Sequence, residues 1–129
     1  MNTKVTGNLG ENIAARYLIN SGYEIIERNY REGADEIDII ATSQKGMLIF
    51  FEVKAMTVGD GYRASLCGFM PEDHLNWQKL KRISRACQKF AVRNRRLIDE
   101  DEGWQIDLIA IVIKGDKKYD LRHYKNVSL

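Results

Sequence analysis

Two acidic residues and a lysine occupy two short segments of the chain that a predicted hairpin would bring together. Asp38 lies in Glu36-Ile37-Asp38-Ile39-Ile40-Ala41, and Glu52 and Lys54 lie in Phe50-Phe51-Glu52-Val53-Lys54. Side chains alternate along a strand, so Glu52 and Lys54 project from one face with Cα atoms roughly 7 Å apart. If the two segments pair, Asp38 can approach Glu52. Two converging carboxylates cost energy unless a cation lies between them, so this spacing predicts a divalent-ion site.

The donor atoms in these segments suit Mg²⁺ or Mn²⁺, because Mg²⁺ takes oxygen ligands and retains several waters. Asp38, Glu52 and the backbone carbonyl of Val53 would be the protein ligands. A phosphodiester oxygen and a water would complete the shell, and the ion would polarise the phosphate and activate the water. Lys54 would orient that water or stabilise charge in the transition state. The predicted chemistry is metal-dependent phosphodiester hydrolysis, with Asp38, Glu52 and Lys54 as catalytic residues.

Further acids could support this site. Glu11, in a predicted first helix, and Glu36, on the strand face of Asp38, could bind a second metal or position a water. The alternatives are a first-turn acid that favours its helix dipole, for Glu11, and a solvent-facing strand residue, for Glu36. Asp107 interrupts an apolar strand, and we expect it to pair with the basic helix or an arginine. His123 has no partner pattern and is expected at the surface.

A concentrated run of basic residues predicts a polyanionic partner. Between positions 74 and 98 there are eight basic residues and no acidic ones, although the whole chain has a net charge of only +2. Such an element suits nucleic acid, and the alternative is a solvated basic helix face. The residues expected to contact nucleic acid, mainly through phosphates, are Gln78, Lys79, Arg82, Arg85 and Lys89.

Hydrophobic periodicity predicts the elements that would position these residues. We expect helices over residues 8–20 and 75–98, strands over 23–29, 36–42, 47–54, 104–113 and 119–124, and a long loop over 55–73. In the second strand, Ile37, Ile39 and Ala41 should share one face, and Asp38 and Ile40 the other. The third strand is apolar on both faces, which predicts a central place in its sheet. The expected fold is α/β, with the order α-β-β-β-α-β-β.

Length and composition favour one globular domain over residues 1–129. The chain is 44% hydrophobic and 29% charged, which is typical of folded soluble proteins. Its longest uncharged apolar run, Leu108 to Ile113, is far shorter than the ~20 residues that span a bilayer. No secretory signal is recognisable at the N-terminus. Cys67 and Cys87 form no CxxC motif and read as free thiols rather than zinc ligands. We therefore expect a cytoplasmic protein with no membrane partner.

Several motifs together resemble the YraN-like family of small bacterial proteins. They are Gly7-Asn8-Leu9-Gly10-Glu11, Ala14-Ala15-Arg16-Tyr17-Leu18, Gly22 to Arg31, Glu36 to Ala41, and Phe51-Glu52-Val53-Lys54. That family is placed in the restriction-endonuclease-like superfamily and is similar in layout to archaeal Holliday-junction resolvases. The resemblance implies a central mixed sheet flanked by helices. It also implies metal ligation by Asp38 and Glu52, a catalytic Lys54 and a supporting Glu11.

The chain departs from the family pattern at two places. Asp35 stands where the family usually has a glycine, and Ala55-Met56 stands where a basic residue commonly follows the catalytic lysine. Both departures concern nucleic-acid contacts near the site and leave the metal ligands unchanged.

Two functions from different classes follow from the sequence. The first is a magnesium-dependent endonuclease of the PD-(D/E)xK type, acting on structured or branched DNA in preference to RNA. The second is a nucleic-acid-binding module with a nuclease-like fold and no catalysis. A third hypothesis is an interaction domain whose basic helix binds an acidic protein. Cutting both strands of a junction needs two sites, so a homodimer is expected if the substrate is a junction.

Overall fold

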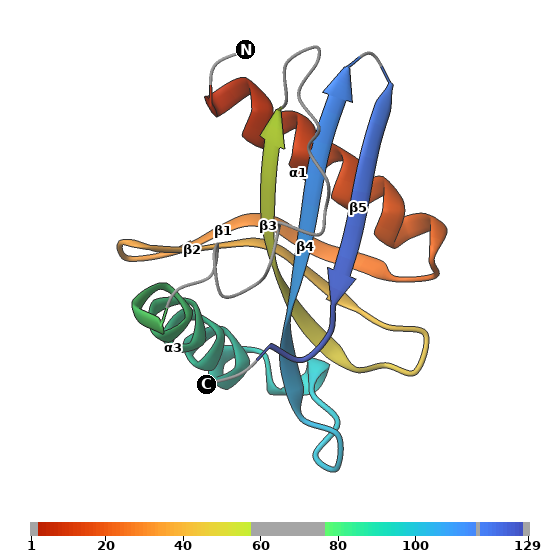
Figure 1. The fold of residues 1–129 in the computed structure, drawn as a ribbon. Helices are drawn as coiled ribbons and strands as arrows, with labels where there is room; N and C mark the ends of the chain where they lie inside the picture. The colour runs from red at the N-terminus through yellow and green to blue at the C-terminus, as the bar shows by residue number, and fades with distance from the viewer. Residues whose placement is uncertain (1–2, 58–76, 116, 128–129) are drawn as a thin grey trace.

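A mixed sheet runs through the protein, with one helix against each face. The computed structural model describes residues 3–57, 77–115 and 117–127 (Figure 1). The described elements are α1 (Thr3–Asn20), β1 (Glu24–Glu32), β2 (Asp35–Thr42), β3 (Leu48–Thr57), α3 (Trp77–Arg93), the 3₁₀ helix η2 (Arg95–Leu97), β4 (Trp104–Gly115) and β5 (Lys118–Tyr124). This confirms the predicted α/β architecture and the order α-β-β-β-α-β-β.

Strand order in the described sheet follows the chain, β1-β2-β3-β4-β5. Neighbouring strands are antiparallel except β3 and β4, which are parallel. Parallel neighbours need a crossover connection, and α3 lies within the connection between β3 and β4. β3 is central, as its apolar faces predicted, and its first five residues are buried.

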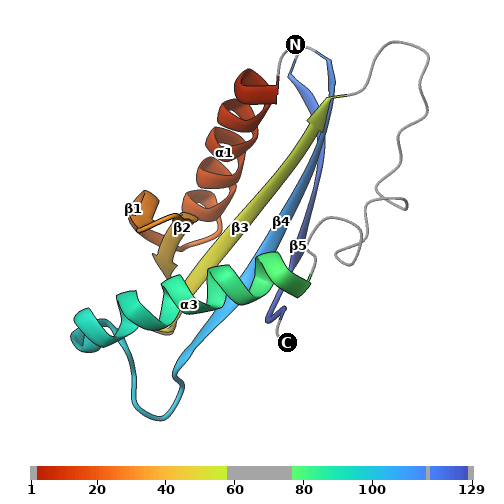
Figure 2. The same ribbon diagram turned by 90° about the vertical axis from the view of Figure 1, so that its left-hand side faces the viewer.

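Two hydrophobic clusters pack the helices against opposite faces of the sheet. On one face, Leu18 of α1 packs with Ile39 and Phe51. On the other face, Phe90 of α3 packs with Phe50. Figure 1 and Figure 2 both show the β1–β2 hairpin between the two helices. The alternation of Phe50 and Phe51 therefore supplies both cores from one strand.

β3 is longer than the sequence predicted. It continues past Lys54 to Thr57 because Ala55, Met56 and Thr57 keep the parallel register with β4. α1 lies close to this extension, since a Cβ atom built on Gly10 would be 2.4 Å from the Cβ of Ala55. A side chain at position 10 would push the helix from the strand. The rest of the predicted loop, residues 58–73, lies outside the described residues.

The helices also differ at their ends from the prediction. α1 begins at Thr3 instead of residue 8, and α3 ends at Arg93 instead of continuing to residue 98. At that end, Asn94 has φ −130° and its side-chain amide donates to the Phe90 carbonyl at 2.9 Å. The non-helical backbone of Asn94, with ψ 46°, interrupts the helix, and η2 follows it.

The predicted alternation along β2 is wrong at Ile37. Ile39 and Ala41 face α1, but Ile37 joins Ile40 on the α3 side. Pairing between β2 and β3 runs from Thr42↔Leu48 to Ile39↔Phe51 and stops there. β2 therefore separates from β3 at Asp38, and this separation positions the site described next.

Candidate active site

Asp38, Glu52 and Lys54 come together where β2 leaves β3. Asp38 Oδ2 accepts a hydrogen bond from the Val53 N–H at 2.7 Å, directly beyond the last paired residues. Lys54 Nζ lies 3.4 Å from Glu52 Oε1, as their shared strand face predicted. The hydrogen bond from Val53 brings the Asp38 carboxyl to the backbone between the other two residues. The structure thus brings together the three side chains in which the sequence predicted chemistry.

Burial makes the two carboxyl groups of this site interdependent. Glu52 is only 5% exposed and Asp38 is half-buried. Burial raises the pKa of Asp38 to about 8, with further contributions from the Glu52 charge and a hydrogen bond between the two side chains, against the opposing effect of the Val53 N–H. The site therefore holds a proton near neutral pH because two adjacent carboxylates are costly to ionise together.

Lys79, near the start of α3, reaches the same acid. Its Nζ lies 2.6 Å from Glu52 Oε1. Burial acts to lower the pKa of Lys79, but the Glu52 charge, hydrogen bonds to Glu52 and Lys54 and the Asp38 charge together outweigh it, and the net shift is upward. The pKa of Lys54 is lowered, by burial and then by the neighbouring Lys79. Lys79 was expected to contact a nucleic-acid phosphate. Its contact with Glu52 joins two elements distant in the chain, so the local sequence pattern does not predict it.

A pocket of about 230 Å³ opens between the start of β2 and α3. The residues that line it are Ala34, Asp35, Glu36, Asp38, Glu52, Lys79, Arg82 and Ile83. Glu36 therefore borders the site, although its carboxylate also lies 3.8 Å from Arg31 on the exposed side. Acidic groups on the strands and basic groups on the helix face one another across the pocket.

Glu11 is a neighbour of the site held by a separate partner. It is 9% exposed, and Arg28 Nε donates to its Oε1 at 3.3 Å. Its charge contributes to the raised pKa of Asp38. In the described part of the chain, no three His, Cys, Asp or Glu side chains form a group that could hold a metal ion. The alternative of a first-turn acid is wrong, because α1 begins eight residues earlier.

The remaining donors fit a hard divalent ion. Asp38 and Glu52 offer carboxylate oxygens, which Mg²⁺ prefers. The N–H and C=O groups of one strand residue point to the same side. Since the Val53 N–H faces Asp38, its carbonyl faces the same gap. Two carboxylates and one carbonyl would leave the other coordination positions to water and substrate.

Comparison with known proteins identifies the family. A family model described as "Uncharacterised protein family UPF0102" matches residues 10–111. The chain belongs to the UPF0102 family. It is 39% identical over 125 residues to a UPF0102 protein of Alkaliphilus metalliredigens, covering 96% of each chain. It is 32% identical over 123 residues to one of Trichlorobacter lovleyi, covering 95% of this chain and 89% of that protein. The YraN-like resemblance is thereby confirmed.

Two solved structures resemble the UPF0102 chain at low sequence identity. One is a repair endonuclease from Pyrococcus abyssi, with a TM-score of 0.44 and 11% identity, covering 90% of this chain and 40% of that one. The other is SfsA from Pyrococcus furiosus in complex with Ca²⁺, with a TM-score of 0.40 and 20% identity, covering 99% of this chain and 66% of that one. At these TM-scores neither likeness supports a function.

The basic face of α3 in this UPF0102 protein is partly neutralised by the β1–β2 hairpin. Arg85 Nε and Nη2 each lie 3.1 Å from Asp35 Oδ2, and Arg93 Nη1 lies 2.6 Å from Glu32 Oε2. The departure from the family pattern at Asp35 therefore supplies a partner for Arg85. Among the other residues expected to bind nucleic acid, Gln78, Arg82 and Lys89 are exposed.

Asp107 belongs to a buried polar network. Its Oδ2 lies 2.7 Å from His123 Nε2, and its Oδ1 accepts from the Gln105 side chain at 2.8 Å and from the Asn126 N–H at 2.9 Å. The Tyr17 hydroxyl lies 2.8 Å from His123 Nδ1. The expected pairing of Asp107 with the basic helix or an arginine is wrong, as is the surface position of His123, whose side chain is 6% exposed. Gln105 is two residues from Asp107 on β4, but Tyr17, His123 and Asn126 come from segments further away, and no local spacing links them to Asp107.

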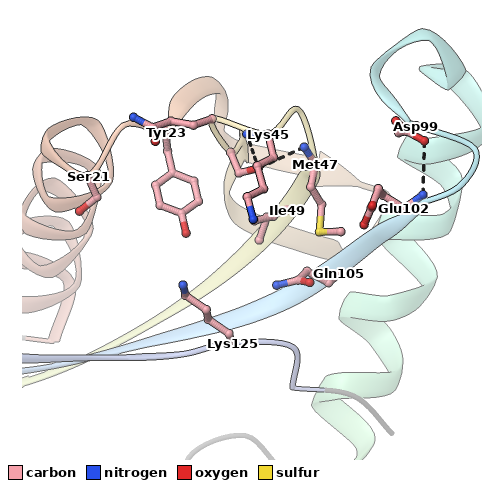
Figure 3. A pocket seen from close by; sticks show the side chains of 11 residues that line it. Ser21, Tyr23, Lys45, Met47, Ile49, Asp99, Glu102, Gln105 and Lys125 are labelled. Carbon is pink, nitrogen blue, oxygen red and sulfur yellow. Dashed lines mark hydrogen bonds between the residues drawn. The ribbon is translucent and has the colours of Figure 1, made fainter.

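A larger pocket, of about 550 Å³, lies away from the acid pair. Figure 3 shows Tyr23, Lys45, Gln105 and Lys125 around it, with Asp99 and Glu102 toward one end. None of the three predicted catalytic residues lines it. In the UPF0102 protein the larger hollow and the predicted chemistry are therefore separate features.

No helix in the described ranges is both long and apolar enough to cross a membrane. Cys87 is buried within the α3 core, and burial raises the pKa of its thiol. It is therefore an inert core side chain rather than a reactive one. Cys67 lies outside the described residues.

Proposed function

We propose that this UPF0102 protein is a metal-dependent endonuclease of the PD-(D/E)xK type. The observation that carries the proposal is the meeting of Asp38 and Glu52 at the point where β2 leaves β3, with the pKa of Asp38 raised to about 8. A divalent cation would compensate the charges of both carboxylates in a buried pair of this kind. Strongly perturbed acids in a pocket are typical of functional sites.

Asp38, Glu52 and the Val53 carbonyl would hold Mg²⁺ or Mn²⁺, which supplies Lewis acidity at the phosphate and lowers the pKa of a bound water. Asp38 would be deprotonated as a ligand of that ion. Lys54, 3.4 Å from Glu52 Oε1, would stabilise negative charge on the reacting phosphate. Arg82, on the pocket rim, would bind a phosphate oxygen and orient the backbone. Glu11 and Glu36 would support the site electrostatically.

The finer assignments are also proposals. The substrate is proposed to be DNA rather than RNA, with structured or branched forms preferred, as the resemblance to Holliday-junction resolvases implies. A basic helix beside the pocket can hold backbone phosphates without reading bases. A homodimer would place two such pockets on a junction. A cytoplasmic location is also a proposal, as the sequence predicted.

The second candidate is a nucleic-acid-binding module without catalysis. It is favoured by the exposed basic residues of α3, which do not depend on the acid pair. This candidate predicts affinity for nucleic acid that is unchanged when Glu52 is replaced, together with no cleavage.

A cleavage panel tests the proposal. Branched, flapped, single-stranded and duplex DNA and matched RNA are incubated with the protein in Mg²⁺ or Mn²⁺. Cleavage of at least one substrate should fall about 100-fold or more in Glu52→Gln and Lys54→Met, while binding persists. Asp120→Asn, which removes an acid on β5 paired with Lys114, is the matched control and should cleave normally.

Binding without any cleavage would favour the non-catalytic module. Cleavage that Glu52→Gln leaves intact would show that the acid pair is not the catalytic site.

A further inference from the structure

Lys79 makes a short contact with Glu52, the buried acid of the candidate site. Its Nζ lies 2.6 Å from Glu52 Oε1, and Lys54 Nζ lies 3.4 Å from the same oxygen. Lys54 is on β3 with Glu52, whereas Lys79 comes from α3. Two ammonium groups from different elements therefore converge on one oxygen atom.

The two ammonium groups compensate the buried negative charge of Glu52. Its side chain is 6% exposed, and a buried carboxylate needs a compensating positive charge. Lys54 supplies part of that positive charge from the same face of β3 as Glu52. Lys79 adds a second cation, and the two lysines repel one another, which contributes to the lowered pKa of Lys54. With Lys79, the two ammonium groups carry one more positive charge than a simple ion pair with Glu52 needs.

A divalent ion on Glu52 Oε1 would compete with Lys79 for the same place. An ammonium 2.6 Å from a carboxylate oxygen occupies the space where a metal ligated by that oxygen would lie, and the two cations repel. Lysine is a compact charge on a flexible stem, so it can change partner without movement of the helix. Arg82 stands one helical turn further along α3 and lines the same pocket.

We propose that Lys79 is a positioning residue that takes the place of the divalent ion at Glu52 and, when the ion binds, moves to the substrate phosphate beside Arg82. This inference rests on the proposed function, because it assumes that Glu52 is a metal ligand. Lys79 then pairs either with Glu52 or with a substrate phosphate. Because the metal releases Lys79 for the phosphate, metal and nucleic acid each strengthen the binding of the other.

Mn²⁺ titration calorimetry without nucleic acid tests the competition. Lys79→Met should bind Mn²⁺ about tenfold more tightly than the wild type, a difference of about 1.4 kcal/mol. Lys118→Met removes an exposed lysine of β5 that does not line the pocket and should bind as the wild type does. Lys79→Arg keeps the charge and should remain within about threefold of the wild type. A merely structural role for Lys79 would weaken metal binding on its removal.

Unchanged or weaker Mn²⁺ binding by Lys79→Met, with normal binding by the wild type, overturns the inference and leaves the proposed function standing. Binding by Lys79→Met alone supports the inference. Absence of binding by the wild type, Lys79→Met and Lys118→Met overturns the metal site and the inference together. If Glu52→Gln binds Mn²⁺ as tightly as the wild type does, the metal site and the inference are also overturned together.

A second measurement tests the movement to phosphate. The affinity for labelled branched DNA is measured in EDTA and in Ca²⁺ for the wild type and Lys79→Met. Ca²⁺ should strengthen binding more in the wild type, because only there does the metal release a lysine for phosphate. Equal strengthening in the two proteins would overturn this part of the inference.

Discussion

Asp38 is the side chain whose ionisation the fold changes most clearly. Its pKa is raised from an ordinary value of 3.8 to about 8, first by burial and then by the charge of Glu52. In the metal-free protein Asp38 is therefore protonated over a range in which it is ionised in the unfolded chain. The native state binds the extra proton, so the stability contributed by this group falls as pH rises from about 4 to about 8.

We predict that Asp38→Asn flattens this pH dependence in EDTA. An amide cannot ionise, so its melting temperature should change much less between pH 5 and pH 8 than that of the wild type, and Asp38→Asn should be the more stable protein at pH 8. Thermal unfolding followed by circular dichroism at several pH values measures this. Asp120→Asn is the control, and the prediction fails if Asp38→Asn keeps the wild-type slope.

At the scale of elements, α3 uses its basic residues in three ways. Arg85 and Arg93 pair with acids of the β1–β2 hairpin. Lys79 and Arg82 line the pocket. Lys81 and Lys89 are exposed and lie two helical turns apart. The third set is the part of α3 best placed to neutralise backbone phosphates away from the chemistry.

We predict that Lys81→Ala/Lys89→Ala reduces the salt dependence of DNA binding. Each lost phosphate contact should change the log–log slope by about 0.9, so the double variant should lie about 1.8 closer to zero than the wild type. Fluorescence anisotropy with duplex DNA over a range of salt concentrations measures the slope. Lys45→Ala/Lys118→Ala removes the same charge from two exposed lysines in other parts of the chain and should leave the slope near that of the wild type.

A wild-type slope near zero would remove nucleic acid as the partner of α3. An equal reduction in both double variants would indicate a general charge effect rather than a binding face.

At the scale of the whole molecule, the Asp107 network joins elements far apart in the sequence. Asp107 is fully buried in β4 and is linked through His123 of β5 to Tyr17 of α1. The backbone of Asn126, beyond β5, donates to the same carboxylate. A buried carboxylate with three hydrogen-bond partners stabilises the fold, and removing it leaves those partners unsatisfied.

We predict that Asp107→Ala lowers the free energy of unfolding by about 3–5 kcal/mol. Urea unfolding followed by tryptophan fluorescence measures the loss. Asp120→Ala, which removes one partner of the more exposed Lys114–Asp120 pair, should cost less than about 1 kcal/mol. Comparable stability of Asp107→Ala and the wild type would contradict a structural role for the network.

The sequence by itself determined the order of the elements and the composition of the acid–lysine site. Period-two alternation placed Glu52 and Lys54 on one face of β3, and the apolar character of β3 predicted its central position. These features depend on spacing within one strand, which the backbone pleat sets independently of the rest of the fold.

Only the tertiary structure decided how the separate elements meet. Lys79 reaches Glu52, Arg85 reaches Asp35, and His123 reaches Asp107. The separation of β2 from β3 at Asp38 also broke the alternation expected from β2 alone. The physical reason is that local periodicity gives the direction of a side chain relative to its own backbone. Its partner depends on how a helix docks on a sheet and where strand pairing stops, and both are set by packing between segments distant in the chain.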